Sequence, residues 1–236
     1  MDVTKNPLSD PTSIFEYGRR EQNKLAQVST KVLNSVSSNK LHNVDEIIRE
    51  LIVILNNTNT KKRSFKFLGR RESEANQEEE VMKQVSKLEL TFLNAKVNML
   101  EMEKILNNAL PAYKELQRKI VEAKDYQSHF TDDQDLLSEK INALELSSAV
   151  SMQIFTQMQA IIISDKTLIA KIEFIIKTTI PSWRASIISS IQDKRGSDSR
   201  TNDSVVNELK SLLDDCQKNK EEHNKIKELS LFNAGM

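Results

Sequence analysis

The residue types that most often carry out chemistry are few and scattered in this sequence. Its single cysteine, Cys216, is either a reactive thiol or a small hydrophobic group, and its place on the apolar face of a predicted helix favours the second interpretation. The three histidines, His42, His129 and His223, are far apart, each near a predicted helix end or exposed turn, and none has the H-E-x-x-H spacing of a metal site. We therefore expect no catalytic residues, no metal and no cofactor, and a protein that is not an enzyme.

Other kinds of chemical site also lack a sequence signal. There is no glycine-rich phosphate loop, and the sequence does not indicate a Ser/His/Asp set. Carboxylates are abundant, but a helix rich in glutamate usually presents a solvated face. An oxyanion- or metal-binding protein stays an alternative, because inward-facing glutamate and histidine in a helical bundle could form such a site.

A basic and aromatic segment at residues 61–71 is the first candidate for partner binding. It could attach to anionic lipid, nucleic acid or an acidic partner, or it could be a helix connection with packed phenylalanines and solvated basic groups. Glutamates follow it directly and could neutralise much of its charge. The candidate contact residues in it are Lys61, Lys62, Arg63, Phe65, Lys66, Phe67, Arg70 and Arg71.

The stretch Pro181-Ser182-Trp183-Arg184 is the second candidate, and it contains the only tryptophan. Pro181 removes one backbone donor and should kink a helix at this point. Trp183 then either fills the space beside the bend or, with Arg184, forms a docking surface, since Trp and Arg are enriched at binding hot spots. The sequence leaves both interpretations open.

Composition indicates the kind of scaffold that must hold these residues. The chain has 236 residues with four glycines and four prolines, too few for a loop-rich or all-β fold. Lysine plus arginine equals aspartate plus glutamate, so the net charge is zero and gives no general case for binding nucleic acid. The polar N-terminus and the short apolar runs lead us to expect a soluble, cytoplasmic protein without a membrane span.

Apolar periodicity predicts an all-α fold: an elongated bundle of long antiparallel helices with coiled-coil-like packing. The clearest signal is a seam with alternating steps of four and three, and its phase continues past Pro111, which predicts one kinked helix and not two. Long seams of this kind also make self-association plausible. The seam residues are Val81, Val85, Leu88, Phe92, Ala95, Met99, Met102, Leu106, Ala109, Tyr113, Leu116, Ile120 and Ala123.

Breaks in the pattern suggest the organisation of the chain. We expect a disordered arm over 1–12, a helical bundle over 13–195 and a C-terminal helix over 196–236. Within the bundle, helices should begin near Ser13, after Asn43 as N-cap, near 72–77 and after a capping box at 131–134.

Three stretches, in this order along the chain, resemble the toxic anion resistance family, the TelA-like proteins associated with tellurite resistance. The first is Ile14-Phe15-Glu16-Tyr17-Gly18 with Val32-Leu33 downstream, and the second is Phe67-Leu68-Gly69 before a long helix that ends in Ala112-Tyr113-Lys114-Glu115-Leu116. The third and most specific is Ile176-Lys177-Thr178-Thr179-Ile180-Pro181-Ser182-Trp183-Arg184, whose part 179–184 is similar to the family's T-I-P-x-W-K/R signature. Pro111 and the short region after Arg195 depart from the family pattern.

The resemblance implies cytoplasmic helical proteins linked to resistance to tellurite and to stress on the cell envelope. It supplies no catalytic residues for transfer to this chain. We therefore expect an accessory protein that acts without catalysis through protein partners. A peripheral scaffold that binds anionic membrane through residues 61–71 is an alternative, and nucleic acid is not an expected partner.

Overall fold

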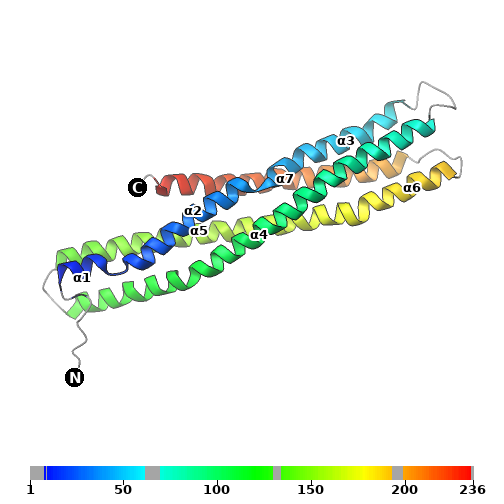
Figure 1. The fold of residues 1–236 in the computed structure, drawn as a ribbon. Coiled ribbons are helices and arrows are strands. Elements are labelled where there is room, and N and C mark those ends of the chain that lie inside the picture. The colour runs from blue at the N-terminus through cyan, green and yellow to red at the C-terminus, as the bar shows by residue number, and fades with distance from the viewer. Residues whose placement is uncertain (1–7, 9, 62–69, 130–133, 193–198, 235–236) are drawn as a thin grey trace. The chain divides into compact units, whose positions relative to one another are not determined.

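The computed structural model describes residues 8, 10–61, 70–129, 134–192 and 199–234, and in this part of the chain it contains helices and no strand (Figure 1). The all-α class predicted from the sequence is therefore confirmed. The elements are α1 (Pro11–Glu16), α2 (Arg19–Ser38), the short 3-10 helix η1 (Lys40–Asn43), α3 (Val44–Lys61), α4 (Arg70–His129), α5 (Gln134–Phe174), the π-helix η2 (Ile175–Thr179), α6 (Ile180–Gln192) and α7 (Ser199–Ala234).

The chain divides into two compact units, and each consists of several separate chain segments. Unit 1 comprises residues 1–37, 100–160 and 224–236, and unit 2 comprises residues 38–99 and 161–223. Helix α7 contributes to unit 2 as far as His223. Val205, Leu209 and Cys216 of α7 belong to the apolar core of that unit. The expected domain boundary at residue 195 stays a prediction.

Unit 2 has a continuous apolar core drawn from all of its long helices. Leu51 of α3, Leu88 of α4, Ile172 of α5 and Leu209 of α7 are each completely buried in it. Every one of these positions belongs to a stripe with helical spacing, which is why the sequence pattern could find them. Burying side chains of this size stabilises a fold by about 1.5–3 kcal/mol each relative to exposure.

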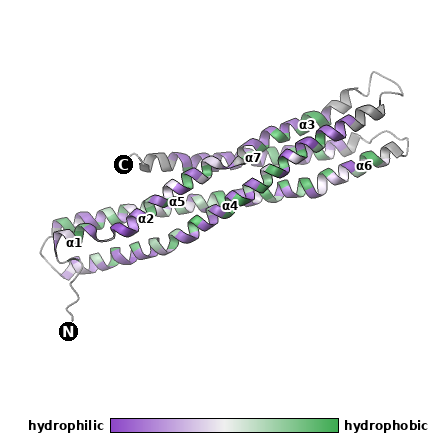
Figure 2. Cartoon of the chain, viewed as in Figure 1, coloured by the Kyte–Doolittle hydropathy of each residue, from purple (hydrophilic) through white to green (hydrophobic). Residues whose placement is uncertain are grey.

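Unit 1 buries the C-terminal half of the predicted seam. Met102, Leu106, Ala109, Leu116 and Ala123 of α4 are all buried. Helix α4 continues through a proline within it at position 111, as the unbroken phase of the seam predicted. Along α4 and α5, apolar and polar residues alternate in the way that one-sided burial requires (Figure 2).

The first helix predicted from Ser13 is interrupted. Asp10 caps α1, its Oδ1 accepting from the Ser13 backbone nitrogen at 3.0 Å, with a proline in the first turn. Gly18 then has a positive φ of 73°, and a Cβ added there would lie 2.6 Å from a Leu144 side-chain carbon. Glycine suits this turn because it tolerates positive φ and leaves room for the neighbouring helix.

The starts of α3 and α1 can also be compared with the predicted ones. Asn39 caps η1, its side chain accepting from the Leu41 backbone nitrogen at 3.0 Å, and α3 then begins at Val44, directly after Asn43, where the sequence predicted a helix start. Helix α1 begins at Pro11, inside the arm expected to be disordered, and Leu8 before it is buried. The predicted capping box at 131–134 lies almost entirely outside the described residues.

One helical stretch of the described chain, Asp135–Ser189, is long and apolar enough to cross a membrane by length and composition. The expectation of no membrane span stays a prediction. Buried residues such as Phe155, Met158 and Ile172 contribute to this apolar character within the two units. A core helix of this composition passes the same length and hydropathy test as a membrane helix.

Candidate functional site

The family-like stretch 179–184 sits where the helical hydrogen-bonding pattern changes. Five residues, Ile175–Thr179, form the π-helix η2, and the Ile180 backbone nitrogen donates to the Ile175 carbonyl. Pro181 follows directly and has no backbone N–H to give to the preceding turn. A π-turn is one way to accommodate that loss, and such turns recur at functional positions. Where the sequence predicted a bend, just before Pro181, the structure has a widened helical turn.

Trp183 lies in the core of unit 2, with 1% of its surface exposed. Its indole Nε1 donates to Asn202 Oδ1 of α7 at 2.8 Å, and Asn202 Nδ2 in turn donates to the Leu55 carbonyl of α3 at 3.4 Å. A side chain this deeply buried presents no surface to a partner. The structure thus favours the role of space-filling core residue over docking for Trp183, and it adds a polar clasp that joins α6, α7 and α3.

Arg184 has the opposite surroundings. Half of its side chain is exposed, and its Nε donates to Glu78 of α4 in an ion pair. Thr179 makes a comparable link on the other side of the bend, donating from its hydroxyl to Glu208 of α7. Of the two candidates in this stretch, only Arg184 remains at a surface where another molecule could reach it.

The basic and aromatic segment 61–71 lies mainly outside the described residues. Lys61 is the last residue of α3, and Arg70 and Arg71 are the first two of α4. The other five candidates, Lys62, Arg63, Phe65, Lys66 and Phe67, belong to residues 62–69, which the structure does not describe. Lipid binding by this segment stays a prediction.

A buried polar cluster in unit 2 was missed by the sequence reasoning. Asp165 of α5 is 1% exposed and accepts three hydrogen bonds: from Asn39 Nδ2 at 3.1 Å, from Asn219 Nδ2 at 2.7 Å and from His223 Nε2 at 2.8 Å. These contacts join the α2–η1 junction, α5 and α7. We call Asn39, Asp165, Asn219 and His223 the Asp165 cluster.

The expectation that His223 lies near a helix end or an exposed turn was wrong. It is inside α7 and completely buried, because its ring reaches the carboxylate of Asp165. A usable signal was present in the sequence: Asp165 occupies a position between Ile162 and Ile169, on the apolar stripe of its own helix. A lone acid at such a position must be paired or hydrogen-bonded, since burying it without partners is costly.

Cys216 behaves as a core residue. It is buried among the apolar side chains of unit 2, and this burial, with the nearby carboxylate of Asp45 as a smaller cause, raises the pKa of its thiol to about 12. A thiol that stays protonated is a poor nucleophile and a poor metal ligand. Within the described residues, no three His, Cys, Asp or Glu side chains are grouped so as to hold a metal ion.

These contacts define a class of protein: a helical framework in which the distinctive polar and aromatic side chains, such as Trp183 and Asp165, join helices to one another. The comparison with known families assigns it more narrowly. The model of the toxic anion resistance protein (TelA) family matches residues 73–213, more than half of the chain, and the chain belongs to this family. The match includes the 179–184 stretch but not the family-like stretch at residues 14–36. Neither the curated proteins nor the solved structures gave a match.

Proposed function

We propose that this chain is an accessory of resistance to toxic anions such as tellurite and of the response to envelope stress, acting through contacts with other proteins and without catalysis. Membership of the toxic anion resistance family supports the general role. In unit 2, side chains of residues 179–184, the family's most specific stretch, join neighbouring helices, and this supports the scaffold role.

The observation that carries the proposal is the clasp around Trp183. The indole Nε1 to Asn202 bond, the Asn202 to Leu55 bond and the Thr179 to Glu208 bond all use side chains of the matched region to join helices. Side chains used in this way fix the register of a bundle and hold its outer faces in place. A protein whose helices are fixed in this way can act as a scaffold that presents its outer faces to partner proteins.

Arg184 is the residue of this stretch best placed to test the proposal. We expect Arg184→Ala to lower tellurite resistance when it replaces the normal chain in a strain lacking the gene, while the melting temperature of the purified protein stays the same. An exposed ion pair such as Arg184–Glu78 contributes little to stability, so a loss of resistance would report a lost contact.

Arg118→Ala is the matched control, because Arg118 is also half-exposed and pairs with Glu115 and Glu122 on α4. It should leave resistance at the normal level. Purified chain that consumes tellurite in the presence of a reductant would overturn the non-catalytic part of the proposal. Equal resistance in the Arg184 and Arg118 variants would overturn the part assigned to Arg184.

A further inference from the structure

One exposed face of unit 1 carries an excess of positive charge. The chain as a whole is neutral, with 34 basic and 34 acidic residues. Over residues 15–31, from α1 into α2, the exposed residues include only one acid, Glu16, but four basic residues: Arg19, Arg20, Lys24 and Lys31. We call these four residues, together with Phe15 of α1 and Lys140 of α5, the basic face. A local excess of charge on a neutral protein attracts partners of the opposite sign.

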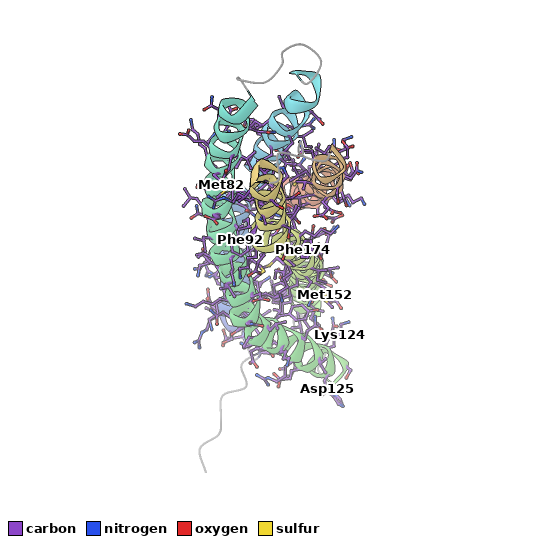
Figure 3. All side chains as sticks on the ribbon, turned by 90° about the vertical axis from the view of Figure 1, so that its right-hand side faces the viewer. Met82, Phe92, Lys124, Asp125, Met152 and Phe174 are labelled. Atoms are coloured by element: carbon purple, nitrogen blue, oxygen red, sulfur yellow. The ribbon has the colours of Figure 1, made fainter. Side chains whose placement is uncertain are left out.

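Most of the charge on the basic face is not neutralised by the chain itself. In the part of the chain that the structure describes, Arg20, Lys24 and Lys31 make no ion pair, whereas Arg19 pairs with Glu16. Basic residues on α4 of the same unit have partners. Lys124, labelled in Figure 3, lies 2.5 Å from the carboxylate of Glu145. The charges of the basic face are therefore available to a ligand from outside.

An exposed aromatic ring lies among these charges. Phe15 is 61% exposed, and the guanidinium carbon of Arg19 lies 5.5 Å from its ring centre. Lys140 Nζ lies 5.8 Å from the same ring centre and donates to the Phe15 carbonyl at 2.8 Å, which holds the lysine at this place. An exposed phenylalanine beside lysine and arginine is the combination by which amphipathic segments bind membrane surfaces.

The two cations beside Phe15 also repel each other. Burial lowers the pKa of Lys140 below its ordinary value, Glu16 raises it, and the positive charge of Arg19 lowers it. An anionic group that binds next to Arg19 and Lys140 would offset this repulsion, because each cation would then face an opposite charge.

A hollow on the basic face shows what kind of ligand fits. Its volume is about 510 Å³, and its lining residues are Glu16, Arg19, Arg20, Asn23, Lys24 and Gln27. All six are polar and exposed, whereas sites for small organic molecules are mostly apolar and enclose their ligand. Arginine and lysine at an open surface suit a phosphate group that approaches from outside.

We propose that the basic face binds the surface of a membrane that contains anionic phospholipid, with lipid phosphates at Arg20 and Lys24 and the Phe15 ring in the interfacial layer. Single-stranded nucleic acid fits less well, because two cations already lie beside the ring on which a base would stack. This site is separate from segment 61–71. The inference rests on the charges and exposure of unit 1 and does not depend on the proposed role in resistance.

Sedimentation with lipid vesicles tests the proposal on the purified full chain. The chain should sediment with vesicles of phosphatidylglycerol mixed with phosphatidylcholine and stay in solution with phosphatidylcholine alone. Added salt should release it, because exposed charges are screened. No sedimentation with the anionic vesicles at low salt would overturn the proposal. So would equal sedimentation with both kinds of vesicle, or tighter binding to single-stranded RNA than to anionic vesicles.

A matched pair of double variants tests the location. Each basic group held near an anionic membrane strengthens binding roughly fivefold, so Arg20→Gln with Lys24→Gln should weaken vesicle binding roughly tenfold or more. Lys104→Gln with Lys114→Gln is the control, because both lysines are exposed on α4 of the same unit and the net charge changes equally. The control should bind within about twofold of the normal chain. Equal weakening in the two double variants would contradict the assigned face.

Two further measurements separate the basic face from other sites. Phe15→Trp adds an exposed tryptophan, while the natural Trp183 is buried and supplies a constant signal. Emission should shift to shorter wavelength when anionic vesicles are added, and an unchanged spectrum on bound chain would overturn the role of Phe15. Normal binding of the Arg20 and Lys24 double variant, with binding lost in Lys62→Gln and Arg63→Gln, would assign the contact to segment 61–71 instead. Circular dichroism checks that each variant remains folded.

Discussion

The two units of this chain place their polar contacts differently. Unit 2 buries them: the Asp165 cluster and the Trp183–Asn202 bond lie in its interior. Several of those in unit 1 are only partly buried: the Tyr17 hydroxyl donates to Glu122 at 3.0 Å and Gln22 Nε2 donates to Ser147 at 2.8 Å. Its buried exception is Glu21, 6% exposed, which lies 3.2 Å from Lys119. A buried hydrogen bond is costly to break because its groups are left without water. We therefore expect unit 2 to tolerate polar substitutions less well than unit 1.

The largest expected effect is at Trp183. Trp183→Ala removes the biggest buried side chain of unit 2 and leaves Asn202 Oδ1 without its donor. The loss of stability should be about 3–5 kcal/mol. Urea unfolding followed by circular dichroism measures it, and Trp183→Phe is the control that keeps most of the ring. A loss below about 1 kcal/mol for the alanine variant would show that the ring is not a core residue.

Asp165→Ala should cause the next largest loss of stability. It leaves the donors of Asn39, Asn219 and His223 buried without an acceptor. Each unpaired donor costs about 1–3 kcal/mol, partly offset by relaxation or entry of water. Hydrogen exchange with mass spectrometry should show lost protection in α5 and α7 within residues 161–223, with less change in unit 1. Equal loss in both units would break the distinction between them.

Gly18→Ala is the sharpest backbone test of unit 1. The added methyl group meets Leu144 at 2.6 Å, and the positive φ of 73° is strained for alanine. We expect a loss of about 1–3 kcal/mol. Ser86→Ala, which also introduces alanine but at an exposed helical position of α4, is the control and should be close to neutral. Hydrogen exchange should locate the damage in residues 10–37 and around Leu144.

The smallest effect concerns Tyr17 and alkaline pH. Burial, and then the hydrogen bond to Glu122, raise the pKa of Tyr17 above its ordinary value of about 10. A group with a raised pKa in the folded state stabilises it below the unfolded pKa, and the contribution is lost as pH rises through the folded value. Stability of unit 1 should therefore fall above roughly pH 10, and Tyr17→Phe should reduce that fall. Identical pH profiles for the two proteins would contradict this assignment.

Apolar spacing made the helices and most core positions predictable. Residues such as Leu88, Leu116 and Ile172 belong to stripes that a single helix reveals by itself, so the fold class followed from local pattern. A change in helical hydrogen bonding next to Pro181 was also predictable, because the missing N–H is a property of one residue. The π-helical form of this turn was not predictable from the sequence, since a π-turn depends on how the following helix packs.

The candidate site was only partly predictable. The Asp165 cluster brings together side chains separated by 54, 58 and 126 positions, and no local pattern indicates which distant donors will meet a carboxylate. Trp183 stood out in the sequence as the only tryptophan, but its burial depends on the neighbouring helices, which the sequence pattern does not reveal.

The interleaving of the two units affects how the protein is made. Boundaries between them fall near residues 37, 99, 160 and 223, so neither unit is complete until α7 has been synthesised. Most multidomain chains let an N-terminal domain fold while the ribosome is still translating the rest. Here the core around Leu51 and Leu88 cannot be completed until Leu209 has left the ribosome, and their apolar surface stays exposed in the growing chain until then. Slowing translation before α7 should therefore bring no early folding, and chaperones that cover apolar helices should matter most until α7 has emerged from the ribosome.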